Sequence, residues 1–343
     1  MNKPILAITM GDAAGVGPEI IAKALSHDDV LQKCSPLIIG SERALQRGMK
    51  ITGCSFAYNK YTSDIDLPAN PDGISLLNEE GFFSEHLPLA AIEASCGAAA
   101  FAWLNQGIQL ALNHKAAAIV TAPLHKEALN QAGHHYAGHT EILAEKTGTE
   151  KFSLMLISGL FRVVHVTCHE PLANVGPMLT QDRIINSISL FDHALTNLDQ
   201  HRPRIAVCAF NPHAGEGGLF GKEEQESIQP AIEHCASAGI TVEGPFPSDS
   251  IFPQLIGGRY DGVVAMYHDQ GHIPFKLANF KFDPTKKEWE TVTGVNVTLG
   301  LPIIRTSVDH GTAFDIAGTG KASERSLLDA IDVALRLTRK EQE

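Results

Sequence analysis

The sequence predicts an α/β protein built on a largely parallel sheet. Short apolar runs alternate along the chain with segments of helical spacing, which is the pattern of strands joined by crossover helices. Three of these runs, 161–168, 204–210 and 262–266, share a second feature, because each leads into a histidine within a few residues. In open α/β sheets, ligands bind outside the carboxyl ends of the strands. We therefore expect the functional site at these three strand ends.

Size and composition indicate the domain organisation. A chain of 343 residues exceeds the usual limit of a single hydrophobic core, so we expect two α/β domains. Residues 1–130 and 300–343 are expected to form the first domain. Residues 131–299 are expected to form the second, which carries most of the metal and substrate candidates. With 44% hydrophobic and 19% charged residues, the chain has the composition of an ordinary globular protein.

Charge and targeting features limit the partners and the location. The formal charge of −12 argues against nucleic acid or an anionic membrane surface as the main partner. No apolar stretch approaches the roughly 18 to 20 residues of a spanning helix, and the run Ile5–Met10 is too short for the core of a signal peptide. The six cysteines form no C-x-x-C pair, which indicates reduced thiols and a cytoplasmic protein.

The N-terminal segment predicts a strand, a glycine-rich turn and a helix. Pro4–Met10 is the expected strand and Ile20–Leu25 the expected helix, with Gly11–Glu19 between them. The glycines of this turn allow the backbone to approach a ligand closely. It is neither a Walker loop nor a G-x-G-x-x-G fingerprint. A simple strand-to-helix connection is the alternative.

The remaining elements follow from the same alternation. Thr140 is expected to cap the helix that begins near residue 138, and Pro230 to kink or split the helix 223–238. Residues 279–292 are expected to form a polar excursion that carries Trp289. The other expected elements are strands at 36–40 and 116–120, helices at 90–112, 182–195, 223–238 and 323–339, and extended segments at 295–302 and 303–307.

Three histidines form the candidate metal site. His169, His213 and His268 each follow one of the three apolar strands. Three imidazoles on Zn²⁺ or a similar ion leave positions open for a substrate, as a catalytic metal site requires. The chain holds 16 histidines, however, and a solvated or hydrogen-bonded imidazole is the alternative for each. His272 and His310 could support the ligands or be ordinary core histidines.

Cationic and hydrogen-bonding side chains form a candidate site for an anionic substrate. Lys276 and Arg305 are a point-charge and a bidentate donor, a usual pair for phosphate and carboxylate. The alternative for either is a solvated surface charge. That alternative is weaker for Arg305, which is expected at the end of an apolar strand. His139 and Thr140, at the start of a predicted helix, could help to hold the anion.

Two further polar residues have possible catalytic roles. Asn296 could donate a hydrogen bond to a substrate hydroxyl. Asp249, in a Pro-Ser-Asp-Ser segment, could position a proton-transfer group or could only cap a turn.

Five motifs occur together in a familiar order: Gly11–Glu19, Gly138–Glu141, Asn211–Gly218, Tyr267–Gly271 and Arg305–Thr312. With these motifs the chain resembles the 4-hydroxythreonine-4-phosphate dehydrogenase family essentially from end to end. The resemblance implies the isocitrate/isopropylmalate dehydrogenase-like fold, with two α/β/α domains flanking a cleft. That fold binds NAD without a Rossmann fingerprint.

The resemblance also implies roles for individual residues. The metal ligands of the family match His169, His213 and His268. Its substrate contacts match a second set, namely His139, Thr140, Lys276, Asn296 and Arg305. A homodimer is implied, with the active site at the interface, so one site could draw histidines from both chains. The NAD contacts map less specifically, to the region 296–320, and the individual cofactor-binding residues stay unknown.

The implied reaction is an NAD-dependent, metal-assisted oxidation at C3, followed by decarboxylation, of a phosphorylated four-carbon 3-hydroxy acid. Zn²⁺ is the first choice of metal, with Mg²⁺ or Co²⁺ as alternatives. Lys276 holds an anionic end of the substrate, and Asp249 or a water relays the proton.

Two sequence features bear on the choice of substrate. The segment from Lys276 to Asn296 is long, and His272–Phe275 is similar to the family branch that oxidises 4-phospho-D-threonate or 4-phospho-D-erythronate. We favour these substrates, which give dihydroxyacetone phosphate and CO₂. The alternative is 4-phosphooxy-L-threonine, in pyridoxal phosphate biosynthesis.

Two other classes of protein could use the same residues. A zinc hydrolase would keep the histidines, bind no NAD and need a carboxylate base beside the metal. A non-catalytic sensor of phosphorylated sugar acids would keep the anion site without needing three histidines.

Overall fold

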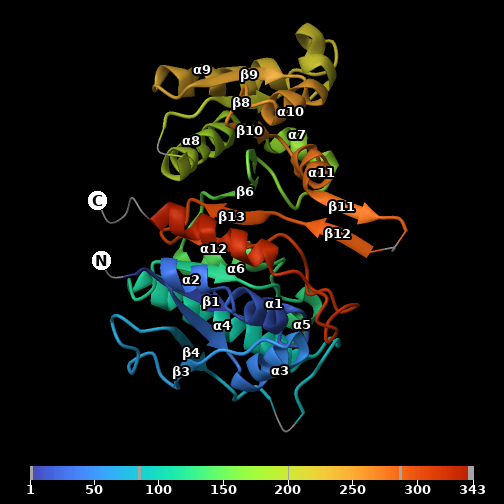
Figure 1. The fold of residues 1–343 in the computed structure, drawn as a ribbon. Coiled ribbons are helices and arrows are strands. Elements are labelled where there is room, and N and C mark those ends of the chain that lie inside the picture. Colours follow the sequence, from blue (N-terminus) through green and yellow to red (C-terminus); the bar gives the residue numbers. More distant parts are fainter. Residues whose placement is uncertain (1–2, 84–85, 200, 286–287, 339–343) are drawn as a thin grey trace. The chain divides into compact units, whose positions relative to one another are not determined.

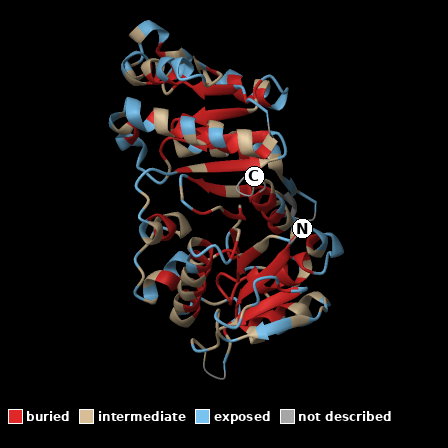
Figure 2. Cartoon of the chain, turned by 90° about the vertical axis from the view of Figure 1, so that its left-hand side faces the viewer, coloured by how far each residue is buried: buried red, intermediate tan, exposed pale blue. Residues whose placement is uncertain are grey.

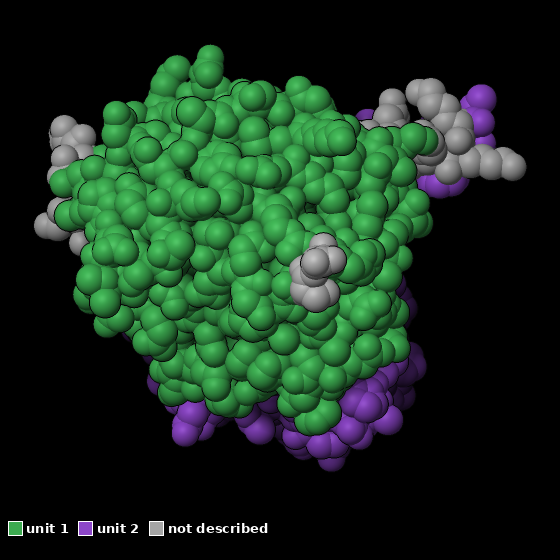
Figure 3. All heavy atoms as spheres, turned by 90° about the horizontal axis from the view of Figure 1, so that it is seen from below, with its two compact units in different colours: residues 1–149, 301–343 green, residues 150–300 purple. Residues whose placement is uncertain are grey.

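Two compact units make up the protein in a computed structural model that describes residues 3–83, 86–199, 201–285 and 288–338. Unit 1 comprises residues 1–149 and 301–343, and unit 2 comprises residues 150–300 (Figure 3). The expected first boundary, at residue 130, lies earlier than the observed one at residue 149. The helix that carries His139 and Thr140 therefore belongs to unit 1. No helix in the described ranges is both long and apolar enough to cross a membrane.

The sheet of unit 1 has the strand order β3-β4-β2-β1-β5-β14, and all of these neighbours pair in parallel. The helices α4, α5 and α6 cover one face, while α1, α3 and α12 cover the other (Figure 1). The elements are β1 (Ile5–Thr9), α1 (Gly17–Ala24), α2 (Asp28–Lys33), β2 (Ser35–Gly40), α3 (Glu42–Thr52), β3 (Tyr58–Tyr61), β4 (Ile74–Asn78), α4 (Ala94–Leu112), β5 (Ala118–Thr121), α5 (Lys126–Gln131), α6 (His139–Thr147), β14 (Arg305–Val308) and α12 (Arg325–Thr338).

The sheet of unit 2 has the order β13-β6-β7-β10-β8-β9. Its strands from β7 to β9 are parallel, whereas β6 is antiparallel to both of its neighbours. The elements are β6 (Ser153–Ser158), β7 (Phe161–His165), α7 (Leu172–Met178), α8 (Gln181–Asp199), β8 (Ile205–Cys208), η1 (Pro212–Gly218), η2 (Glu224–Ile228), α9 (Gln229–Ser237), β9 (Val242–Phe246), α10 (Ser248–Ile256), β10 (Gly262–Ala265), α11 (His268–Asn279), β11 (Phe280–Asp283), β12 (Glu288–Val292) and β13 (Val295–Leu299).

Both sheets are buried on their two faces, as parallel sheets covered by helices must be (Figure 2). In unit 2, one cluster joins β7, β8 and β10 to α10 and α11 through side chains such as Phe161, Phe252 and Phe275. The opposite face packs against α8. There Gly262 approaches the ring of Phe191 so closely that an added Cβ would lie 2.4 Å from it. These contacts fix the carboxyl ends of the three central strands.

Several expected elements need correction. Within the expected polar excursion 279–292, β11 (Phe280–Asp283) and β12 (Glu288–Val292) pair as antiparallel strands, and apolar and polar residues alternate along β11. The side chain of Trp289 lies outside the described residues. The expected helix 223–238 is split near Pro230, as one of the two predicted outcomes, since η2 is a turn of π-helix and α9 begins at Gln229.

Candidate active site

The three predicted strand ends are neighbours in unit 2. Strand β10 pairs in parallel with β7 on one side and with β8 on the other. His169 lies four residues beyond β7, His213 lies in η1 after β8, and His268 begins α11 after β10. The expectation that parallel strands bring these segments to one sheet edge is confirmed. The role of the histidines as metal ligands stays a prediction.

Two of these histidines lie side by side. The ring centroids of His169 and His268 are 5.8 Å apart. Both residues line a pocket of about 320 Å³, together with Glu170, Tyr267 and Asp269. The pocket thus combines imidazole nitrogen with carboxylate and phenol oxygen, and this donor set suits a divalent metal ion.

His268 is oriented from two sides. Its Nδ1 donates a hydrogen bond to the Asp269 carboxylate at 2.7 Å, which leaves Nε2 as the nitrogen with a lone pair. The ring of His272 stacks on that of His268 with centroids 3.6 Å apart and planes 11° apart. The His272 Nδ1 is 3.0 Å from the backbone carbonyl of His268, within hydrogen-bond distance. A carboxylate on the far nitrogen is the usual support for a metal-binding histidine.

His213 is not among the residues that line this pocket. It is exposed on η1, and its ring is 6.4 Å from that of Phe220. Within the described part of the chain, no group of three histidine, cysteine or acidic side chains has the geometry to hold a metal ion. A single chain therefore brings together His169 and His268 but not all three predicted ligands.

Gln270 is a structural residue that the sequence reasoning did not single out. This buried amide lies in the first turn of α11. Its Oε1 accepts from the backbone N–H of Met266 at 2.6 Å. Its Nε2 donates to the carbonyl of Ala209 at 2.7 Å and to Ser248 Oγ at 2.8 Å. Gln270 thereby ties together the ends of β8 and β10 and the start of α10. The sequence feature that could have identified Gln270 was its position inside the motif Tyr267–Gly271.

His165 is a second residue that the sequence reasoning passed over. It is the last residue of β7, 1% exposed, with its ring centroid 4.7 Å from that of His272. Its Nδ1 is 3.2 Å from the carbonyl of Leu154. Burial lowers the pKa of His165 to about 4, so the ring is neutral at neutral pH. An uncharged imidazole thus underlies the exposed histidines.

The anion-binding candidates of unit 1 surround a buried guanidinium. Arg305 is 3% exposed and donates from Nη2 to Thr121 Oγ1 at 2.8 Å. Burial lowers the pKa of Arg305 to about 9, more than the nearby Glu141 carboxylate raises it. The guanidinium therefore keeps its charge at neutral pH. Burial of this charge costs desolvation free energy, which a bound anion would offset. The sequence predicted Arg305 at the end of a strand, whereas it is the first residue of β14.

His139 and Thr140 open α6 in the same unit. The pKa of His139 is well below its ordinary value, chiefly because of burial and further because of the Arg305 charge. A hydrogen bond to the Ala122 carbonyl opposes that shift. The helix N-cap is Gly138, so the prediction that Thr140 caps the helix is wrong. His139 thus stands as a neutral hydrogen-bonding group near a cation.

The other predicted residues lie in unit 2. Lys276 occupies the last turn of α11, with its Nζ 4.1 Å from the centroid of the Phe280 ring. Asn296 is half-buried on β13, and Asp249 is exposed in the first turn of α10. Lys276 is therefore on the same helix as His268, two turns further along.

The glycine-rich turn Gly11–Glu19 contacts another loop of unit 1. The backbone N–H of Val16 donates to the carbonyl of Thr312 at 3.0 Å, and a Cβ on Gly15 would lie 2.8 Å from that oxygen. The buried Glu19 accepts from the N–H groups of Gly318 and Gly320 at 2.6 and 2.8 Å. The close backbone approach that the glycines permit therefore serves to hold the loop 311–320.

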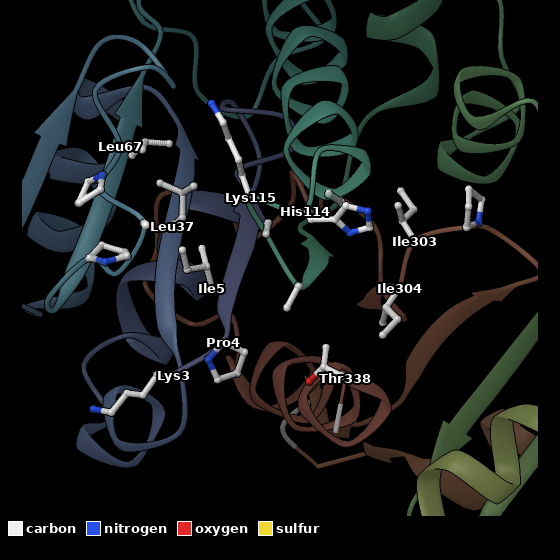
Figure 4. A pocket seen from close by; sticks show the side chains of 17 residues that line it. Lys3, Pro4, Ile5, Leu37, Leu67, His114, Lys115, Ile303, Ile304 and Thr338 are labelled. Carbon is white, nitrogen blue, oxygen red and sulfur yellow. The ribbon is translucent and has the colours of Figure 1, made fainter. Parts of the chain in front are cut away.

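A larger cavity, of about 720 Å³, lies at the opposite, amino end of the unit 1 strands (Figure 4). Its lining is mainly apolar and includes Ile5, Leu37 and Ile303. The two lysines at its rim already have partners, because Lys3 donates to a backbone carbonyl and Lys115 pairs with a carboxylate. Both lysines are thus engaged with other groups of the protein, and we assign the cavity no function.

Comparison with known proteins identifies the family of the chain. The family model of the pyridoxal phosphate biosynthetic protein PdxA matches residues 32–334. A D-threonate 4-phosphate dehydrogenase of Cupriavidus necator is 44% identical over 329 residues, which cover 96% of this chain and 95% of that relative. A solved 4-hydroxythreonine-4-phosphate dehydrogenase of Klebsiella pneumoniae is 40% identical, with a TM-score of 0.81 over 98% of this chain and 100% of its own.

A more distant solved structure supports the fold class. A β-decarboxylating dehydrogenase of Thermococcus kodakarensis is 13% identical, with a TM-score of 0.50 over 96% of this chain and 81% of its own. At that identity the likeness concerns the fold alone. The predicted isocitrate/isopropylmalate dehydrogenase-like α/β fold is confirmed.

Proposed function

Because the chain belongs to the family of the pyridoxal phosphate biosynthetic protein PdxA, we propose that it is an NAD-dependent, metal-assisted dehydrogenase of a phosphorylated four-carbon 3-hydroxy acid. Oxidation takes place at C3, and the resulting β-keto acid loses CO₂. We favour 4-phospho-D-threonate or 4-phospho-D-erythronate as the substrate, either of which gives dihydroxyacetone phosphate. The observation that carries the proposal is the pair His169 and His268, which lies beside carboxylates at the carboxyl edge of the unit 2 sheet.

The donor set fits a divalent ion. The Nε2 of His268 is left as an acceptor by the bond from Nδ1 to Asp269, and His169 presents a second imidazole to the same pocket. Imidazole nitrogens favour Zn²⁺ over Mg²⁺. A bound divalent ion supplies Lewis acidity, which lowers the pKa of a C3 alcohol and stabilises the negative charge left as CO₂ departs.

The third ligand comes from a second chain in this proposal. His213 is exposed and apart from His169 and His268 in the described residues of one chain. We infer a homodimer in which each site draws histidines from both copies. No disulfide joins any of the six cysteines, all of which are described, and this is compatible with the cytoplasmic location that we propose.

Each unit holds its own candidates for binding substrate charge. The buried Arg305, fixed by Thr121, binds one anionic end of the acid through its planar fork of N–H donors. His139 and Thr140 contribute neutral hydrogen bonds next to that cation. Lys276 holds the second anionic end as a point charge, and Asn296 donates to a substrate hydroxyl. The neutral form of His139 leaves the guanidinium without added repulsion.

Proton transfer falls to Lys276 and Asp249. The C3 hydroxyl must lose a proton before hydride can leave, and the carbanion left by CO₂ must gain one. Lys276 is anchored against Phe280, four residues further along, which limits the volume its Nζ explores. Asp249 is exposed and could pass a proton to solvent, directly or through a water.

Nicotinamide cofactor contacts belong to the region 296–320 in this proposal. Within this region, the loop 311–320 is held by hydrogen bonds to Val16 and Glu19, so its backbone is fixed before a cofactor binds. Preorganised backbone lowers the entropic cost of binding. The individual cofactor-binding residues stay unassigned.

A second substrate is favoured by the name of a relative. The Klebsiella pneumoniae protein, 40% identical, is a 4-hydroxythreonine-4-phosphate dehydrogenase. 4-Phosphooxy-L-threonine, with an amine in place of the C2 hydroxyl, is therefore the alternative. The zinc-hydrolase and sensor hypotheses lose their support, because the relatives named above are dehydrogenases.

The substrate is tested by NADH formation with the purified protein. The assay compares 4-phospho-D-threonate, 4-phospho-D-erythronate and 4-phosphooxy-L-threonine at equal concentration. We expect turnover of a sugar acid, with the released dihydroxyacetone phosphate measured in a separate end-point assay after the protein has been removed. Turnover of the amino acid alone would assign the chain to pyridoxal phosphate synthesis. No NADH from any of the three would refute the proposed activity.

A further inference from the structure

The turn that carries His213 has a strained backbone. Five consecutive residues, from His213 to Gly217, have positive φ angles of 52°, 55°, 75°, 45° and 67°. His213, Ala214 and Glu216 are among them, and residues with a Cβ rarely adopt this left-handed conformation. Such strain persists only where surrounding contacts hold it, and it is concentrated at functional sites. The chain must therefore contain an anchor for this turn.

The anchor is a buried carboxylate. Glu224 is 4% exposed. Its Oε1 accepts from the backbone N–H groups of Phe210 and Asn211 at 2.9 and 2.7 Å, and its Oε2 accepts from Asn211 Nδ2 at 3.0 Å. One side chain thus binds two successive backbone N–H groups between β8 and the strained turn. Asn211 Nδ2 also donates to Glu223 Oε2 at 2.7 Å.

The strained residues also pack directly against this carboxylate. A Cβ on Gly215 would lie 2.8 Å from Glu224 Oε2. Glu224 begins the π-helical turn η2, and single π-helical turns are frequent at functional sites. Glu224 therefore contacts both the segment that leads into the turn and the inner side of the turn. These contacts set the position of the turn.

We propose that Glu224 is a positioning residue, which fixes the turn so that the imidazole of His213 is presented as a metal ligand. This inference rests on the proposed metal-dependent function. Glu224 itself binds no ligand, because its oxygens accept from the backbone and from Asn211. Its effect on metal affinity passes through His213 alone.

The test measures Zn²⁺ affinity of the full chain by competition with a chromophoric chelator. The variants are Glu224→Ala, Glu224→Gln, His213→Ala and the double variant of Glu224→Ala with His213→Ala. Glu226→Ala, on the same turn but exposed, is the matched control. Hydrogen–deuterium exchange of residues 209–219 reports the turn directly. We expect Glu224→Ala to weaken Zn²⁺ binding about 10- to 100-fold and to speed exchange in the turn, with a smaller effect for Glu224→Gln, which keeps one acceptor.

The double variant separates positioning from general destabilisation. If Glu224 acts through His213, the double variant binds Zn²⁺ no more weakly than His213→Ala alone. Wild-type affinity or unchanged exchange in Glu224→Ala, or additive losses in the double variant, would overturn the inference. If Glu224→Ala does not fold, Glu224→Gln decides by the same criteria. Absence of Zn²⁺ binding by the wild type would instead contradict the proposed function, on which the inference depends.

Discussion

The two units hold their candidate functional residues in different ways. In unit 1, the functional candidates are themselves buried: Arg305 is 3% exposed, and burial shifts the pKa values of Arg305 and His139. In unit 2, His169 and His213 are exposed, and buried polar groups beneath them determine where they lie. Gln270 and Glu224 are the clearest examples, with three hydrogen bonds each.

This difference relates to the ligand that each half would take. An anion is bound strongly by a cation that has already lost its water, because charge interactions are stronger at low dielectric. A metal ion instead needs neutral imidazoles at defined positions with room for substrate, so orientation matters more than burial. Substitutions in unit 1 should therefore act directly on substrate affinity, and those beneath the unit 2 histidines should act on metal affinity.

The largest effect is expected from removal of a metal ligand. His268→Ala should lower kcat/KM by about 1,000-fold or more, since Lewis acidity contributes several kcal/mol to the transition state. Steady-state NADH formation measures the loss. His193→Ala, an exposed histidine on α8, is the control and should keep wild-type activity. Near-normal turnover by His268→Ala would contradict the role of His268 as a catalytic metal ligand.

A smaller loss is expected when the buried cation of unit 1 changes shape. Arg305→Lys keeps the charge but loses the planar fork, so KM should rise about 100-fold, equivalent to about 2.7 kcal/mol. Zn²⁺ affinity should stay unchanged. The exposed Arg325→Lys is the control. If Arg305→Lys weakened metal binding as well, the division of labour between the units would be wrong.

Disruption of the amide beneath the unit 2 histidines should cost stability. Gln270→Ala removes the bonds to the buried Met266 N–H, to the Ala209 carbonyl and to the partly buried Ser248 Oγ, so the free energy of unfolding should fall by about 2–4 kcal/mol. Urea denaturation measures this. Gln254→Ala, which removes a hydrogen bond on the exposed side of α10, should change stability by less than about 1 kcal/mol. Equal effects of the two substitutions would contradict the role of Gln270.

The smallest expected effect is on the pH dependence of stability, through His139. Its pKa is lower in the folded protein than in the unfolded chain, so the unfolded chain binds more protons below about pH 6.5. The stability due to neutral His139 is complete above that pH and is lost as the pH falls, by at most about 1.4 kcal/mol per pH unit. Urea unfolding between pH 7.5 and 5 should show a shallower slope for His139→Gln. An unchanged slope would mean that burial does not hold this ring neutral.

Much of the fold could be predicted from local pattern. The strands at Ile5, Ser35 and Gly262 are continuous apolar runs, and such runs are expected where helices cover both faces of a sheet. Strands β4 and β9 were not predicted from the sequence. They lie in segments rich in Pro, Gly and Asn, where pairing with the neighbouring strands of the sheet decides the conformation. Strand β6 was missed because its antiparallel pairing interrupts the βαβ alternation.

The candidate site was predictable where residue chemistry is distinctive. Exposed histidines after apolar strands and an arginine within an apolar segment stood out in sequence. Glu224, Gln270 and His165 did not, because their contribution depends on hydrogen bonds between segments that only the fold brings together. The separation of His213 from His268 is also a property of the fold, and spacing along the chain does not encode it.

The most direct test of the central claim is metal-dependent turnover by the purified wild-type protein. The metal content of the protein is measured, the protein is stripped with a chelator, and NADH formation from 4-phospho-D-threonate is followed before and after Zn²⁺ is returned. We predict about one metal ion per active site, loss of NADH formation on stripping and its recovery with Zn²⁺. Full activity in the metal-free protein would contradict the claim that the histidines of unit 2 hold a catalytic metal.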